Sequence, residues 1–445
     1  MADRIPNRMA EEGPAVPPVS NGGSLRDVLG LRDFRLFWSG EAISLVGDQF
    51  YLIALPWLVL TLAGGGFALG AALALAAIPR AVLILVGGAV TDRMSPRSVM
   101  ILSNATRLSV VSVLAVVVGT GAVTMWMVYL LSFLFGVGDA FYYPAQMAIV
   151  PSLVRRLHLK VANSLVMGTS MIASFVGPVL AGITIATFMG SGSDLAGIAY
   201  ALAIDAASFL ASIATLVAMH HRDTREPDGE GIMSSLRQGF CYIGRDRTLV
   251  SLALIVMVIN LLLVGPLIVG IPILSKERLS GASSYGIVMT AFGGGALLGI
   301  LLAGGLPRPR GNLGIRLLAL VSLMGVSLSL LTVLGSTAPV ALACLVIGVS
   351  NGYCNVMLVT WLQTRTAEAM MGRVMAMVMF ASVGISPISM QVAGVLLSWQ
   401  PALTFTAMGG ALCAFALVMS MVPEVRRLGF EIGADRAMPR AAEAS

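Results

Sequence analysis

The segment ALGAALALAAIPRAVLILVGGAV, residues 68–90, contains one charged side chain, Arg80. About 20 apolar residues make a helix long enough to cross the roughly 30 Å hydrocarbon layer of a bilayer, so this segment predicts a transmembrane helix. The whole chain of 445 residues has the same character, because 57% of its residues are hydrophobic and only 11% are charged. In a soluble domain about a quarter of the residues are charged, so this composition excludes a water-soluble fold.

Twelve segments of this kind follow one another along the chain, at approximately residues 36–62, 68–91, 98–120, 123–149, 162–189, 195–219, 248–274, 283–303, 313–336, 338–364, 371–398 and 402–422. We therefore predict an all-α membrane protein with twelve transmembrane helices in two pseudo-symmetric six-helix bundles. The expected parts are a disordered cytoplasmic tail with an interfacial helix (1–33), an N-terminal bundle (34–219), a cytoplasmic linker (220–247), a C-terminal bundle (248–422) and a cytoplasmic tail (423–445).

Basic residues are distributed unequally between the two sides of the predicted membrane. Only Lys276 and Arg278 fall in loops on one side, Arg80 and Arg107 fall within spans, and the other 24 of the 28 lie on the side of both termini. Such an excess marks the cytoplasmic side, so we expect a multi-pass protein of the cell membrane with both termini inside. Because these charges lie in short clusters, the net charge of +6 does not indicate a nucleic-acid partner.

The chain lacks the motifs that would indicate a cofactor, a metal or an enzyme. Its four cysteines, Cys241, Cys344, Cys354 and Cys413, have neither metal-binding nor disulfide spacing, and its three histidines fall in charged loops. A GxxxxGK[ST] phosphate loop is not present, and neither HExxH nor GxSxG occurs within a span. We therefore expect no cofactor, no metal and no enzymatic activity.

An internal repeat relates the two predicted halves. An offset of 212 residues superposes Gly136-Val137 on Gly348-Val349, and Ala181-Gly182 on Ala393-Gly394. Each pair lies at the same place in its half, in the fourth and tenth spans and in the fifth and eleventh. Parallel repeats of this kind are typical of transporters whose substrate binds between the halves, near the middle of the bilayer.

The loop after the second span reads GAVTDRMSPR, residues 88–97. Gly88 and Asp92 are one helical turn apart, so the glycine admits a neighbouring helix while the carboxylate meets that helix's positive N-terminal end. Arg93 and Arg97 can then reach partner carboxylates or lipid phosphates. The alternative is a simple anchor of positive charge on the cytoplasmic side.

This loop resembles the GxxxDRxGRR signature of the major facilitator superfamily, with Ser95 in place of its second glycine. Other segments, above all residues 40–60 and 135–154, resemble the branch of that superfamily that contains macrolide efflux pumps and the enterobactin exporter. The resemblance covers about residues 30 to 420. It implies a cytoplasmic gate in which Asp92 latches the two halves in the outward-facing state.

The fifth and fourth spans bear on the direction and coupling of transport. Gly177, Pro178 and Gly182 are similar to the GPxxG element that the family's exporters carry, with one extra residue before the last glycine. The proline bends the helix, and the glycines permit close packing against the other half. The fourth span departs from the family, because Ser132 stands where many proton-coupled antiporters carry an arginine.

Six ionisable residues lie inside the predicted spans, all of them in the N-terminal half: Glu41, Asp48, Arg80, Arg107, Asp139 and Asp205. A charge in the bilayer costs at least ~2.5 kcal/mol, so each is a candidate functional residue. Helix geometry places all six in a slab about 20 Å thick, where they can meet. We expect Asp48 to carry a proton, followed by Glu41 and Asp139. The alternative is that Arg107 and Arg80 form permanent ion pairs with Asp139 and Asp48, and that Asp205 is structural.

Aromatic and amide side chains on the first, fourth and tenth spans are candidates for the wall of a substrate cavity: Phe50, Tyr51, Tyr142, Tyr143, Asn351, Tyr353 and Asn355. Such groups can stack on a planar or lipophilic ligand, although helix packing explains any single one. The sequence favours a monomeric proton-coupled antiporter that exports an amphipathic, drug- or macrolide-like molecule by alternating access. Its partners are the small-molecule substrate, protons and the lipid bilayer. Alternatives are a siderophore exporter or lysophospholipid flippase of the same fold, and a transport-inactive membrane scaffold or sensor.

Overall fold

The computed structural model describes residues 25–189, 195–220, 247–305, 312–366 and 368–426. Within these ranges, twelve helices are long and apolar enough to cross a membrane, which confirms the predicted all-α membrane fold. The predicted N-terminal tail up to residue 24, nearly all of the linker and the C-terminal tail from residue 427 lie outside the described residues.

The first six spans are α2 (Arg32–Ala63), α3 (Gly66–Arg93), α4 (Pro96–Gly119), α5 (Met125–Leu153), α6 (Leu159–Met189) and α7 (Ala196–Ala218). The seventh is composite and comprises α9 (Arg247–Ile259), η2 (Asn260–Val264), η3 (Pro266–Gly270) and α10 (Ile271–Arg278). The last five are α11 (Ala282–Gly305), α12 (Leu313–Leu330), α13 (Thr337–Arg365), α14 (Glu368–Trp399) and α15 (Pro401–Ser420). Short helices precede, connect and follow them: α1 (Leu25–Gly30), η1 (Arg156–His158) and α16 (Pro423–Arg426).

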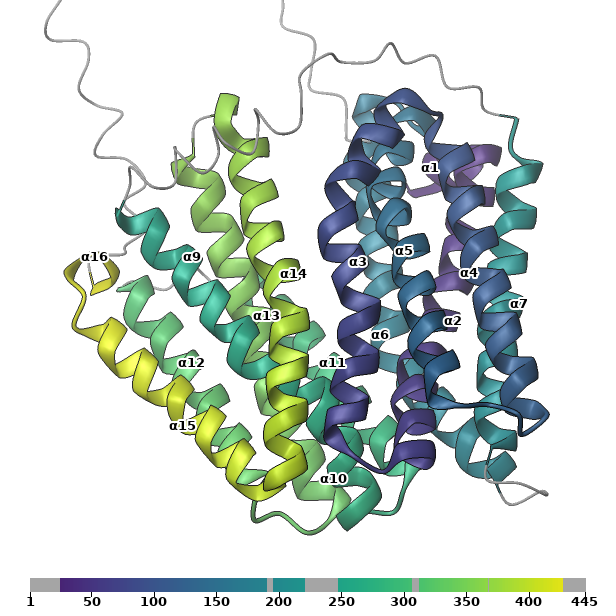
Figure 1. Cartoon of the computed structure of the whole chain (residues 1–445). Coiled ribbons are helices and arrows are strands. Elements are labelled where there is room, and N and C mark those ends of the chain that lie inside the picture. The colour runs from purple at the N-terminus through teal and green to yellow at the C-terminus, as the bar shows by residue number, and fades with distance from the viewer. Residues whose placement is uncertain (1–24, 190–194, 221–246, 306–311, 367, 427–445) are drawn as a thin grey trace, which may run out of the picture.

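The spans form two bundles, α2–α7 and α9–α15, which stand side by side in Figure 1. The bundles approach each other at the end of the molecule where α10 lies, here called the α10 end. They diverge toward the opposite end, where α1 lies, here called the α1 end. Two helix pairs make the main contacts between the bundles, α3 with α14 and α6 with α11.

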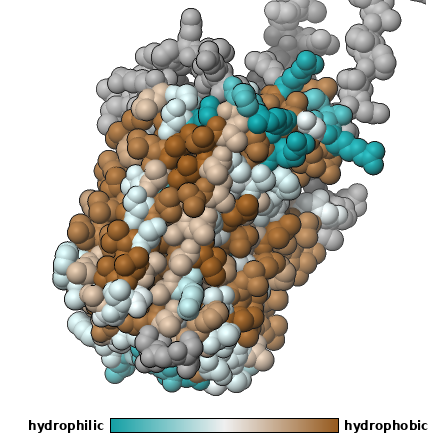
Figure 2. Space-filling view, turned by 90° about the vertical axis from the view of Figure 1, so that its right-hand side faces the viewer, coloured by the Kyte–Doolittle hydropathy of each residue, from teal (hydrophilic) through white to brown (hydrophobic). Residues whose placement is uncertain are grey.

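The outer surface of the N-terminal bundle suits a hydrocarbon environment. Figure 2 shows this face covered largely by hydrophobic side chains, with the most hydrophilic ones gathered toward its upper end. Leu102 and Val116 of α4, for example, are each 64% exposed. A continuous apolar surface of this extent is stable only against lipid.

Glycines at repeat-related positions let helices touch within each bundle. A Cβ atom added to Gly136 of α5 would lie 2.1 Å from the carbonyl oxygen of Ala76 in α3. One added to Gly348 of α13 would lie 2.1 Å from the carbonyl oxygen of Phe292 in α11. The 212-residue offset thus relates two equivalent helix crossings, the fourth span on the second and the tenth on the eighth.

The second pair of repeat-related glycines joins the bundles near the α10 end. A Cβ atom on Gly182 of α6 would lie 3.0 Å from the Cα atom of Gly286 in α11, and one on Gly394 of α14 would lie 3.0 Å from the Cα atom of Gly70 in α3. Gly177 differs from the expectation, because a Cβ there would meet the side chain of Gln49 in α2, within its own bundle. Only the later glycine of the GPxxG-like element therefore packs against the other half.

The seventh span is not a regular α-helix, because η2 and η3 are π-helical turns on either side of Gly265. Pro266 has no N–H to donate, and Ser389 of α14 bridges the irregular backbone from outside. Its hydroxyl accepts from the Gly265 N–H at 2.8 Å and donates to the Leu261 carbonyl at 2.7 Å. A neighbouring helix thereby satisfies polar groups that hydrocarbon would leave unpaired.

Candidate functional site

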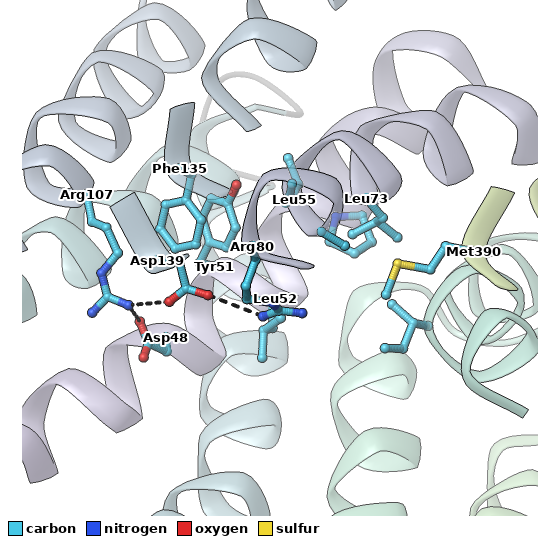
Figure 3. Close-up of a pocket in the computed structure, with 14 residues that line it drawn as sticks. Asp48, Tyr51, Leu52, Leu55, Leu73, Arg80, Arg107, Phe135, Asp139 and Met390 are labelled. Carbon is cyan, nitrogen blue, oxygen red and sulfur yellow. Dashed lines mark hydrogen bonds and ion pairs between the residues drawn. The ribbon is translucent and has the colours of Figure 1, made fainter. Parts of the chain in front are cut away.

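Four charged side chains from four helices form a row near the middle of the N-terminal bundle (Figure 3). Nη1 of Arg107 (α4) lies 3.8 Å from Oδ1 of Asp48 (α2) and 3.0 Å from Oδ1 of Asp139 (α5). Nη1 of Arg80 (α3) lies 3.3 Å from the other carboxylate oxygen of Asp139. The order is Asp48, Arg107, Asp139, Arg80, so the charges alternate in sign along the row.

Arg107 is the fixed centre of the row, with 1% of its surface exposed. Its Nη2 donates to Oδ1 of Asn104 at 2.9 Å, and Nδ2 of Asn104 donates to the Ser212 hydroxyl of α7 at 3.0 Å. Its guanidinium carbon lies 4.3 Å from the ring centroids of both Tyr142 and Phe209. Hydrogen bonds and cation–π contacts thus hold a cation that would otherwise be costly to bury. Ser132 of the fourth span is not basic, and the central cation of the row comes from the third span.

Two further carboxyl groups are buried outside the row. Glu41 of α2 accepts hydrogen bonds from the Tyr142 hydroxyl and the Gln146 amide of α5, and no ion pair to it exists among the described residues. Asp205 of α7 is fully buried, and neither of its oxygens has a hydrogen-bond partner in the described part of the chain. It lies beside Gly47 of α2, where an added Cβ would be 3.0 Å from Oδ1 of Asp205.

A cavity of about 200 Å³ lies against this row, and all four charged residues line it. Tyr51 and Phe135 form part of the wall as a stacked pair, with ring centroids 4.1 Å apart and planes at 14°. The C-terminal bundle adds Ile268 of η3 and Met390 of α14. The cavity, here called the charged cavity, therefore lies between the bundles, with its charges on one side and apolar groups on the other.

The structure separates the residues that the sequence suggested for a substrate cavity. Tyr51 lines the charged cavity, whereas Phe50 is buried between helices and Tyr142 is buried against Glu41 and Arg107. The other four, Tyr143, Asn351, Tyr353 and Asn355, line neither this cavity nor the apolar one described further below. Sequence reasoning missed Phe135, although it precedes Asp139 by one helical turn. It also missed Ile268 and Met390, which carry no polar signal.

The loop motif is only partly described. Gly88, Asp92 and Arg93 belong to the last turns of α3, but the side chains of Asp92 and Arg93 lie outside the described part of the structure. Arg97 at the start of α4 donates from Nε to the Leu216 carbonyl at 2.7 Å and from Nη2 to the Val217 carbonyl at 2.9 Å. These carbonyls end α7, where the helix carries partial negative charge, so Arg97 ties α4 to α7 within its own bundle. The expected reach of Arg93 and Arg97 to a partner carboxylate or a lipid phosphate stays a prediction.

Two polar contacts reinforce the junction of the bundles at the α10 end. Nζ of Lys276 in α10 donates to the Leu60 carbonyl near the end of α2 at 2.5 Å. The backbone N–H of Phe67, in the first turn of α3, donates to the Ser398 hydroxyl of α14 at 2.7 Å. Side chains of the C-terminal bundle thus cap both helix ends of the α2–α3 hairpin.

Comparisons with known proteins agree with this architecture. The sequence matches the family described as Major Facilitator Superfamily over residues 37–389. No curated protein sequence matches the chain.

Solved structures with the same arrangement include a mutant of the nucleoside transporter NupG, with 12% sequence identity, a TM-score of 0.70, and coverage of 87% of this chain and 98% of that one. A bacterial homologue of the iron transporter ferroportin, in an inward-facing state, has 16% identity and a TM-score of 0.70, and covers 90% of this chain and 100% of its own. A bacterial homologue of the human lysosomal transporter Spinster, inward-facing and unoccupied, has 12% identity and a TM-score of 0.65, with coverage of 89% and 96%. At these identities the likeness establishes the fold alone.

Proposed function

The chain belongs to the major facilitator superfamily, a family of membrane transporters rather than enzymes, and we propose that it is a proton-coupled antiporter that exports an amphipathic small molecule from the cell. The sequence resemblance to macrolide efflux pumps and the enterobactin exporter supports export, and the row of charges in a cavity between the bundles supports coupling to protons. We place the protein in the cell membrane with the α1 end in the cytoplasm, because the excess of positive charge lies on that side.

The observation that carries proton coupling is an imbalance of buried charge. The centre of the N-terminal bundle holds four carboxyl groups but only two guanidinium groups, from Glu41, Asp48, Asp139, Asp205, Arg80 and Arg107. An uncompensated charge in a low-dielectric interior is costly, and a carboxyl group avoids that cost by binding a proton. The two guanidinium groups can balance only two of the four carboxylates, so the site can bind protons at the others.

Asp48 is the carboxyl group best placed to exchange a proton. Its side chain is 27% exposed and lines the charged cavity, and its distance of 3.8 Å from Arg107 is longer than that of either other ion pair in the row. Asp139 is held from both sides, and Asp205 does not line the cavity. A proton or a cationic group of the substrate occupies Asp48 in turn, and this competition couples the two fluxes.

Alternating access follows from the asymmetry of the two ends. With the α1 end in the cytoplasm, the divergence of the bundles at that end corresponds to an inward-facing transporter ready to load its substrate (Figure 1). Rocking the bundles apart at the α10 end exposes the same cavity to the outside. In that outward-facing state Asp92 latches the opposite end, as the loop motif suggests.

The test is Asp48→Asn in proteoliposomes that contain the full chain. The cargo is chosen first, from a panel of drugs and siderophores, by the difference in susceptibility between cells with and without the gene. We expect the variant to fold but to lose efflux driven by an imposed pH gradient. Asp33→Asn is the matched control, because Asp33 lies in the first turn of α2, away from the cavity. Efflux that Asp48→Asn leaves unchanged would contradict the proposal and favour a chain in which the buried acids are structural, as in a transport-inactive scaffold or sensor.

A further inference from the structure

A second cavity, here called the apolar cavity, lies next to the charged one, along an adjacent face of α2. It has a volume of about 320 Å³ and is enclosed by α2, α6 and α11. Its wall includes the large apolar side chains of Met171, Met289, Phe292 and Ile300, and its polar groups are uncharged: Gln49, Ser170 and Ser174. Methionine and phenylalanine walls suit an apolar body of adaptable shape.

Leu52 connects the two cavities, because it lines both of them and is 48% exposed. It follows Asp48 by one helical turn, while Gln49, the neighbour of Asp48, faces the apolar cavity. Sites for drug-sized ligands measure about 300–1,000 Å³, so the charged cavity alone is too small for one and the two together are large enough. One molecule that passes over Leu52 would have a polar head among the charges and an apolar body beside α11.

The ends of the charged row are the positions that still offer contacts to a ligand. Arg107 and Asp139 each have charged neighbours on both sides. At one end, Asp48 has the 3.8 Å ion pair with Arg107, and 27% of its side chain is exposed. At the other end, Arg80 has the ion pair with Asp139, and 41% of its side chain is exposed. One open end is therefore negative and the other is positive.

We propose that the substrate is an amphipathic zwitterion, whose cationic group binds Asp48, whose carboxylate or phosphate binds Arg80, and whose apolar body crosses Leu52 into the apolar cavity. A purely cationic head would give Arg80 no contact beyond its ion pair with Asp139, and a purely anionic head would lie near the carboxylate of Asp48. A guanidinium presents several donors in a fixed plane and suits an oxyanion. This inference rests on the proposed function, because competition at Asp48 between the cationic group and a proton would produce antiport.

The test measures binding at equilibrium, without a pH gradient, to the full chain in lipid nanodiscs. Three fluorescent probes share one dansyl-alkyl body and differ only in their heads, which are trimethylammonium, carboxylate or carboxybetaine. We expect the betaine probe to bind about tenfold or more tightly than either other probe. Arg80→Gln should reduce its affinity to that of the ammonium probe, and Asp48→Asn to that of the carboxylate probe.

Two further pairs of variants separate recognition from folding. Arg80→Lys retains the positive charge and should retain most of the preference for the betaine. Leu52→Trp should weaken all three probes because it fills the passage between the cavities, whereas Val82→Trp, at a side chain that is 63% exposed, should weaken none. Thermal unfolding of each variant confirms that the protein measured is folded.

The inference fails if either singly charged probe binds as tightly as the betaine, or if Arg80→Gln weakens the ammonium probe as much as the betaine. Loss of head selectivity together with an Asp48-dependent, gradient-driven efflux would overturn the inference and leave the proposed function standing. Selectivity for the betaine head without such efflux would support the inference and contradict the proposed function. Competition by lysophosphatidylcholine identifies a lipid source for the zwitterion, and retained selectivity without that competition identifies a water-soluble one.

Discussion

The two bundles share a topology but differ in what they bury. Among the described residues, the buried charged side chains are Glu41, Arg107 and Asp205, all in the N-terminal bundle. The buried polar side chains of the C-terminal bundle are uncharged: Ser275, Ser284, Ser327, Ser350, Thr366, Ser389 and Thr404. An internal repeat therefore preserves helix crossings without preserving chemistry. One copy keeps the ionisable groups, and the other supplies shape and apolar surface.

This division fits a machine that moves as two rigid bodies. Every charge in the row belongs to one bundle, so the row can remain assembled while the bundles rock. The contacts that must break and form lie between the bundles, and those seen at the α10 end include backbone contacts between glycines and hydrogen bonds from Phe67, Lys276 and Tyr285. Variants of the row should therefore change stability and coupling, while variants of the junction should change which end is open.

The largest effect is expected from Arg107→Met. Removing the central cation leaves Asp48 and Asp139 without their shared partner in a membrane interior, and breaking a buried ion pair in this way costs about 3–5 kcal/mol. The midpoint temperature of thermal unfolding in detergent should be well below that of the parent. Arg35→Met, at an exposed position of α2, should unfold at the same temperature as the parent.

Adding Asp48→Asn to Arg107→Met should recover part of the lost stability, because Asp48 loses its ion pair with Arg107, whereas Asp139 keeps the one with Arg80. If Arg107→Met unfolds at the temperature of the parent, Arg107 does not stabilise the N-terminal bundle by balancing the charge of its buried carboxylates.

A smaller effect should follow from Gly394→Ala at the junction of α14 with α3. The new Cβ would lie 2.6 Å from the carbonyl oxygen of Gly66 and 3.0 Å from the Cα atom of Gly70, and these are backbone atoms that cannot turn aside. We expect the bundles to separate at the α10 end and transport to fall by about tenfold or more, equivalent to about 1.4 kcal/mol.

Distances between spin labels on α3 and α14 measure this separation. Gly410→Ala in α15 is the control, because no atom lies within 4 Å of its added Cβ. Unchanged label distances in Gly394→Ala would mean that close glycine packing does not determine the closed end.

The sequence predicted the features that depend on composition and on the internal repeat. It missed the features that depend on contacts with residues far away in the sequence. Residues 68–90 predict a membrane helix because an apolar segment of that length is stable as a helix across the bilayer. Gly182 could be predicted because close packing of two helices needs a small residue. The contacts of Arg97 with carbonyls of α7 could not be predicted, because those partners lie more than a hundred positions away. Ile268 and Met390 carry no signal in the sequence, since any apolar residue would suit hydrocarbon equally well. The π-helical turns around Gly265 depend on Ser389, which no local pattern connects to them.

The smallest effects, with opposite signs, are expected at the two ends of the molecule. Lys276→Met removes an ammonium that the C-terminal bundle places on the Leu60 carbonyl. A hydrogen bond from a charged group contributes about 1.5–3 kcal/mol, but Lys276 is exposed and water weakens the interaction, so we expect this bond to contribute about 1 kcal/mol. That change shifts the population about fivefold toward outward-facing states. Asp92→Asn should shift it the other way by a few-fold, because a carboxylate at a helix N-terminus contributes about 0.3–1 kcal/mol.

Labelling of single cysteines from each side of the membrane reports both shifts, with Lys160→Met as the exposed control at the α1 end. The directions of the two shifts are more informative than their sizes. If Lys276 stabilised only its own bundle, its replacement would alter labelling at neither end. If Lys276→Met and Asp92→Asn move accessibility in the same direction, the two ends are not alternating gates of one motion. The difference between the bundles would then be one of stability, with no bearing on which side of the membrane the charged cavity faces.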